Sequence, residues 1–104
     1  SNNQHTAFKL QYFLPDSINA LSFDAVSSAL SKYRKYFDEI DQSIIQPEID
    51  RWKISVQRNF KSKLITEILD TFADDATLRF AYPTVFSSLR LLATLPVTTA
   101  TVER

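Results

Sequence analysis

Three residue types are missing from this chain of 104 residues: it contains no glycine, no cysteine and no methionine. Average usage of about 7% would place roughly seven glycines in this length, so their absence excludes glycine-rich phosphate loops and disfavours tightly turned all-β folds. Without cysteine there is no disulfide framework, no thiol nucleophile and no cysteine-ligated zinc site. The missing initiator methionine predicts that the chain is an excised piece of a longer protein.

Long apolar runs and an excess of charge are absent too. No stretch approaches the roughly 18 apolar residues of a membrane span, and no signal peptide is recognisable. Twelve basic and twelve acidic residues cancel, and the hydrophobic content of 44% is normal for a folded domain. We therefore expect a single domain with a modest core and no membrane contact.

Helical periodicity dominates the chain between its prolines. Ser22 suits an N-cap, and apolar residues then recur every three or four positions up to Ile40, which predicts a helix of about five turns. A second helix is expected from Pro47, with Trp52 as the central core residue of the domain. A third is expected from a cap at Ser62.

The remaining helices are defined by two prolines. The third helix is expected to end at Asp74–Asp75, and residues 77–82 are ambiguous. A fourth helix should start at Pro83 and stop at Pro96, followed by a fifth that is cut off over residues 100–104. The predicted fold is all-α, with about four helices plus a truncated fifth arranged as helical hairpins.

The domain boundaries follow from the same pattern. Residues 1–21 contain only two charges, Lys9 and Asp16, and are expected to be an extended or disordered segment, with a strand over residues 7–14 as the alternative. Residues 22–104 are expected to form the helical region. The predicted core residues are Phe23, Leu30, Phe37, Trp52, Phe60, Ile68 and Phe72.

The helix expected from Pro83 is apolar around too much of its circumference for the surface of a small bundle. One side carries Val85, Phe86, Leu89 and Leu92, and another carries Leu91 and Leu95. Such a helix needs a second packing partner. These six residues either pack within the domain's own core, or form an interface, or do both.

The last quarter of the chain resembles the C-terminal signature of hAT-superfamily transposases, a pattern of the form YP-x-apolar…LL…LP-x-(S/T)(S/T)-x-x-x-ER. The matching residues are Tyr82-Pro83, Leu91-Leu92, Leu95-Pro96, Thr98-Thr99 and Glu103-Arg104. The version here is most similar to that of domesticated transposase proteins of the zinc-finger MYM type and of the repressor of the protein-kinase inhibitor.

This resemblance implies a fold and a function. The region would be the C-terminal dimerisation region, the end of a helical insertion that leads into the last helix of a ribonuclease-H-like fold, in a nuclear zinc-finger protein. Its expected partners are a second copy and the rest of the parent protein. The dimerisation residues would be Val85, Phe86, Leu89, Leu91, Leu92 and Leu95.

The resemblance also gives Glu103 a counterpart, the last carboxylate of the Asp-Asp-Glu triad that holds two divalent metals such as Mg²⁺ in the active family. One carboxylate cannot build such a site, so no cofactor or metal is expected for this chain alone. The lone His5 and the pair Asp74–Asp75 do not change this expectation, because neither is a metal site by itself.

Bases follow one another without an intervening acid from Arg51 to Lys63. Arg51, Arg58 and Lys61 lie near one helical face, where they are candidates for contact with a DNA backbone; a solvated face is the alternative. Three functions therefore remain: a dimerisation and packing module without catalysis, a fragment of an active transposase that contributes one carboxylate, and a helical DNA-contacting module.

Overall fold

The computed structural model describes residues 9–37 and 40–95, and this part of the chain is all-α, as the sequence predicts. It contains five α-helices and four short 3₁₀ helices: η1 (Leu10–Phe13), η2 (Pro15–Ala20), α2 (Phe23–Lys32), η3 (Arg34–Tyr36), η4 (Gln42–Ile44), α3 (Ile45–Asn59), α4 (Ile65–Asp74), α5 (Ala76–Ala81) and α6 (Pro83–Thr94).

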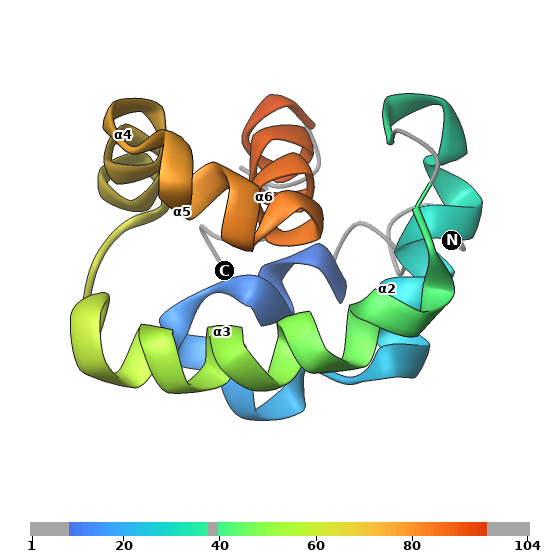
Figure 1. The fold of residues 1–104 in the computed structure, drawn as a ribbon, viewed down its shortest axis with the longest axis horizontal. Coiled ribbons are helices and arrows are strands. Elements are labelled where there is room, and N and C mark those ends of the chain that lie inside the picture. The colour runs from blue at the N-terminus through green and yellow to red at the C-terminus, as the bar shows by residue number, and fades with distance from the viewer. Residues whose placement is uncertain (1–8, 38–39, 96–104) are drawn as a thin grey trace.

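Helix α3 runs along the longest dimension of the molecule, with part of the segment η1–η2 below it (Figure 1). Helices α4, α5 and α6 lie above one part of α3, whereas α2 and η3 lie at the other end. The segment η1–η2 packs against α6, α3 and α2. The core therefore lies between α3, the N-terminal elements η1, η2 and α2, and the C-terminal helices α4 and α6.

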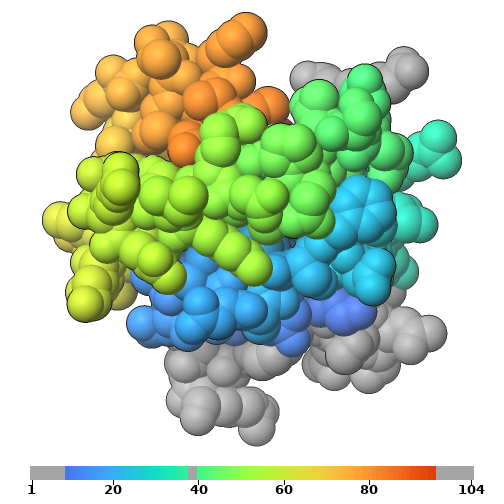
Figure 2. All heavy atoms as spheres, turned by 60° about the horizontal axis from the view of Figure 1, so that its bottom comes forward, coloured from blue at the N-terminus to red at the C-terminus, as the bar shows by residue number. Residues whose placement is uncertain are grey.

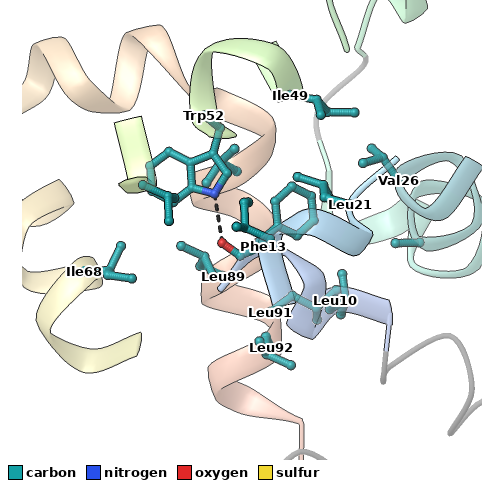
Figure 3. Packing of buried hydrophobic residues seen from close by; sticks show 14 of the residues in the cluster. Leu10, Phe13, Leu21, Val26, Ile49, Trp52, Ile68, Leu89, Leu91 and Leu92 are labelled. Carbon is teal, nitrogen blue, oxygen red and sulfur yellow. Dashed lines mark hydrogen bonds between the residues drawn. The ribbon is translucent and has the colours of Figure 1, made fainter. Parts of the chain in front are cut away.

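The N-terminal segment differs from its prediction. Residues 10–13 and 15–20 form short 3₁₀ helices instead of an extended or disordered segment, and Leu10, Phe13, Ile18 and Leu21 are buried in the core. A buried hydrogen bond fixes the segment, because the Trp52 Nε1–H donates to the Phe13 carbonyl over 2.8 Å (Figure 3). The helical domain thus begins well before residue 22; residues 1–8, with His5, lie outside the described part.

The first long helix is shorter than the periodicity suggests. Ser22 caps α2 as predicted, since its side chain accepts a hydrogen bond from the Ala25 N–H over 3.2 Å, but the helix ends at Lys32. A straight helix from Ser22 to Ile40 would run about 28 Å. The chain instead breaks into η3 and an extended Phe37, because it has to turn back before α3 begins at Ile45.

The turn between α3 and α4 uses Ser62 differently from the prediction. Ser62 has a φ of 66°, a left-handed conformation that glycine would adopt at little cost, and it makes the turn instead of capping the helix. The cap comes from Glu67, whose Oε1 accepts a hydrogen bond from the Leu64 N–H over 2.8 Å. A chain without glycine has reversed direction here through a serine.

Trp52 is the centre of the core, as predicted, and none of its surface is exposed. Its ring contacts those of Phe60, Phe72 and Tyr82 at centroid distances of 5.4, 5.8 and 5.3 Å. Figure 3 shows the indole between α3 and the leucines of α6, with its N–H directed at η1. Among the predicted core residues, Phe23, Leu30 and Phe37 are only partly buried.

Candidate protein-interaction surface

The six residues proposed for dimerisation lie mostly inside the monomer. Helix α6 begins at Pro83 as predicted, but Val85, Leu89 and Leu92 have no exposed surface and Leu91 is 6% exposed. Phe86 and Leu95 are partly buried. Most of these residues therefore lie in the domain's own core, and their part in dimerisation stays a prediction.

The second partner that α6 requires is supplied by the same chain. Helix α6 packs against α3 and α4 on one side and against η1 on another. Leu91, on the second side, lies near Leu10 of η1 (Figure 3). A segment expected to be disordered therefore covers the leucines that the sequence left without a partner.

The outer side of α6 is partly shielded as well. Phe86 stacks on Phe72 of α4 at a centroid distance of 5.1 Å, and the Arg90 guanidinium lies 5.3 Å from the centroid of the Phe86 ring. A cation over an aromatic face is attracted by the ring quadrupole. Phe86 is thus engaged within the monomer, which leaves little of this helix for a partner.

A buried acid that the sequence reasoning missed holds the start of α6. Glu48 of α3 is only 2% exposed, and its Oε2 accepts a hydrogen bond from the Val85 N–H over 2.8 Å. The carboxylate therefore caps α6 from a neighbouring helix, at the end where the helix dipole favours negative charge. Glu48 lies three positions after Ile45 and four before Trp52, which places it on the buried side of α3. This spacing is the sequence signal that could have identified it as a buried acid.

The polar groups around Glu48 compensate only in part for its burial. Burial raises the pKa of the Glu48 carboxyl above its usual value, and the Val85 N–H, the polar groups of the adjacent Thr84 and the Arg51 charge offset only part of that rise. Glu48 Oε1 and Thr84 Oγ1 are both buried without a hydrogen-bond partner. The site stabilises one conformation of α6 but leaves two polar atoms unsatisfied.

The three basic residues proposed for DNA contact have different roles. Arg51 donates a hydrogen bond to the Ala81 carbonyl over 2.8 Å and lies 5.6 Å from the centroid of the Tyr82 ring, so it joins α3 to the end of α5. Arg58 and Lys61 are exposed at the end of α3. Arg58 and Lys61 can therefore contact a partner, and Lys63 in the following turn is exposed as well.

Exposed apolar side chains mark a different surface. Phe80 of α5 is 88% exposed, more than any other large hydrophobic residue in the described part of the chain, and Ile54 of α3 is 54% exposed. The exposed neighbours of Phe80 on α5, Ala76 and Thr77, are uncharged. We call Ile54 and Phe80, with these neighbours, the α3–α5 face.

Short helix α5 is held rigidly in place. The Asp75 carboxylate accepts a hydrogen bond from the Leu78 N–H over 3.1 Å at its start. The Arg79 Nη1 donates to the carbonyls of Phe72 and Ala73 over 2.6 and 2.8 Å. The charged residue of α5 is thus bound to the end of α4, and Phe80 is displayed from a fixed backbone.

The two parts of the α3–α5 face are linked through Arg51. It holds the carbonyl of the residue after Phe80, and it lies three positions before Ile54 on α3. Figure 1 shows α5 directly above the turns of α3 on one side of the molecule. Figure 2 shows α3 exposed across the front of the molecule, beside the helices that follow it.

Within residues 9–37 and 40–95 there is no cluster of three or more side chains suited to hold a metal. None of the described helices is long and apolar enough to cross a membrane. Two hollows adjoin α2: three serines with Asp24 and Lys32 line one, and a mixed set that includes Leu30, Arg34 and Phe37 lines the other. Glu103, the residue with a possible catalytic counterpart, lies outside the described residues.

Searches against protein-family models, curated proteins and solved structures found no match to this chain. The resemblance to hAT transposases therefore rests on the sequence pattern from Tyr82 to Arg104 alone. The part of that pattern within α6 packs as a core helix, and its end from Pro96 onward lies outside the described residues.

Proposed function

We propose that this chain is a non-catalytic protein-packing module that self-associates, as the resemblance to the dimerisation region of hAT-derived proteins implies. In this proposal it works in the nucleus, beside the rest of a parent protein. The contact surface differs from the one expected from sequence: it is the α3–α5 face instead of α6.

The observation that carries the proposal is the exposure of Phe80. Fully burying a side chain of this size contributes about 1.5–3 kcal/mol, and this ring is 88% exposed on a helix that two hydrogen-bonded side chains hold in place. An exposed aromatic ring on an ordered helix is typical of an anchor residue at a protein interface. A partner that covers Phe80 would recover this burial.

The test is sedimentation velocity of the wild type, a Phe80→Asp variant and a Tyr36→Asp control. Tyr36 is a 55% exposed aromatic residue of η3, a segment apart from α4, α5 and α6 (Figure 1). We expect the wild type and the control to self-associate and the Phe80→Asp variant to be monomeric with unchanged helical circular dichroism. A wild type that stays monomeric, or equal association of all three, would contradict the proposal.

A helical DNA-contacting module is the second candidate, because Arg58 and Lys61 are exposed and free of the interhelix role of Arg51. Binding to duplex DNA at about 50 mM salt tests it, since phosphate contacts are strongest at low salt. The third function, a fragment of an active transposase that binds Mg²⁺ through Glu103, requires two further acids from the parent sequence. No feature of the described residues favours it.

A further inference from the structure

The exposed charges at one end of the molecule are segregated by sign. The turn from α3 to α4 carries three exposed bases, which we call the basic turn: Arg58, Lys61 and Lys63. The outer side of α4 carries three exposed acids at positions i, i+3 and i+7, which we call the acidic stripe: Glu67, Asp70 and Asp74. This spacing places the acids on one face of the helix.

Among the residues that the structure describes, neither charged set is paired with the opposite charge. In the part that the structure describes, the six side chains form no ion pair with each other or with a third group. The contact that Glu67 does make is the cap on the Leu64 N–H, which is a bond to neutral backbone. Both sets are therefore available to an outside partner of opposite charge.

The position of the two sets favours a second copy of this chain over a nucleic acid. The basic turn leads directly into α4, so a phosphate backbone that bound the turn would also approach the acidic stripe, which repels it. A second copy of the chain carries both positive and negative charges, so it can pair with both sets. Because the sets are adjacent, a two-fold axis between them lets each basic turn face the other copy's acidic stripe, and the assembly closes as a dimer.

Apolar contacts have to complete such an interface. A stable dimer needs about 800 Å² buried on each partner, and one phenylalanine supplies only about 200 Å². Phe80 therefore requires neighbours. Leu64, which is 67% exposed, lies between the basic turn and α4 and extends the apolar surface toward the charged sets.

Resting on the proposed self-association, we infer that the dimer forms by reciprocal contact of the basic turn of each copy with the acidic stripe of the other, with Leu64 and Phe80 as apolar anchors. The charges fix the register of the two copies and the apolar residues supply the burial. Complementary charge at an interface acts mainly on specificity and association rate, and salt screens it.

The test uses two double charge reversals in the full chain, Lys61→Glu with Lys63→Glu and Asp70→Lys with Asp74→Lys. Each variant alone is expected to weaken the dimer about tenfold or more, because like charges then face each other across the two-fold. An equimolar mixture of the two variants should restore association as a heterodimer, since both contacts are again between opposite charges. A Lys32→Glu, Lys35→Glu variant, altered at the end of α2 and in η3, is the matched control and should dimerise as the wild type does.

Sedimentation equilibrium at about 50 and 500 mM salt reads out these dissociation constants, and circular dichroism checks that each variant folds. A dimer that is unaffected by both reversals but is lost in Phe80→Asp overturns this inference and leaves the proposed function standing. A wild type that is monomeric at both salts overturns both. Two further outcomes overturn the charge pairing alone. In one, both variants are folded but their mixture does not associate. In the other, the basic turn binds duplex DNA, and reversal of its charges leaves the dimer unchanged.

Discussion

Replacement of Glu48 should separate the two roles of this buried carboxyl, its hydrogen bond and its charge. A Glu48→Ala change leaves the buried Val85 N–H without an acceptor, which costs about 1–3 kcal/mol. It also removes packing beside the start of α6. Relief of the desolvated carboxylate opposes these losses, so we expect a decrease of about 2 kcal/mol in the free energy of unfolding at neutral pH.

A Glu48→Gln change should behave differently. The amide keeps an oxygen that accepts from the Val85 N–H, and its NH₂ group can donate to the unpartnered Thr84 Oγ1. It carries no charge to desolvate. We therefore expect the Gln variant to lie within about 1 kcal/mol of the wild type, or above it, at neutral pH.

The pH dependence gives this prediction its sign. Burial raises the folded-state pKa of Glu48 above the usual value of 4.5, so the folded state favours the protonated carboxyl. The stability that this group contributes is therefore greatest below pH 4.5 and is lost as the pH rises through the higher folded value. The Gln variant lacks this loss, and its advantage over the wild type should grow over the same interval.

Urea denaturation followed by tryptophan fluorescence measures these differences. Trp52 is the single tryptophan of the chain and is fully buried, so its emission reports the core directly. Subtracting the unfolding free energy of the Gln variant from that of the wild type at each pH removes the contributions of the other titrating groups, which the two proteins share. A wild-type-to-Gln difference that is constant from pH 4 to pH 8, or an Ala variant as stable as the wild type, would refute the reasoning.

Three further substitutions test the packing. Trp52→Phe removes the hydrogen bond to the Phe13 carbonyl and leaves a cavity, so circular dichroism melts should show a loss of about 2–4 kcal/mol. Leu91→Glu places a charge at a site that is 6% exposed and should unfold the domain instead of merely preventing association, which a loss of helical signal would reveal. Arg51→Ala should cost about 1 kcal/mol in urea denaturation, because it breaks the link between α3 and α5, whereas Arg58→Ala should change stability by less than about 0.5 kcal/mol.

Local signals predicted the helices well where one short-range interaction decides them. Ser22 caps α2, Pro83 starts α6 and Trp52 is the central core residue, because a cap, a proline and a large aromatic ring act within a few residues or at one buried position. The all-α class followed from the helical periodicity and from the absence of glycine. These features depend little on tertiary context.

Predictions failed where distant segments decide the outcome. The periodicity from Ser22 to Ile40 is helical, yet the chain turns back at residue 33 because α3 has to start at Ile45. Residues 10–20 carry no strong pattern of their own, but Trp52 binds one of their carbonyls and α6 covers their apolar side chains. Tertiary contacts override local preference at such positions.

The packing around α6 was only partly predictable for the same reason. The leucines on two sides of α6 correctly indicated two packing partners, but the sequence could not show that η1 is one of them. The role of Glu48 could not be predicted, because its contact with Val85 spans 37 positions. Phe80 lies in a stretch without a clear period, and its exposure emerges only when α5 is in place.

The most direct test of the central claim, that this domain packs against a second copy of itself, is sedimentation equilibrium of the unmodified chain. The measurement should cover concentrations from about 1 to 200 μM at about 50 mM salt, where weak dimers assemble and charges are least screened. We predict an apparent mass that rises toward twice the chain mass of 12.0 kDa. A mass that stays at 12.0 kDa over the whole range would contradict the claim.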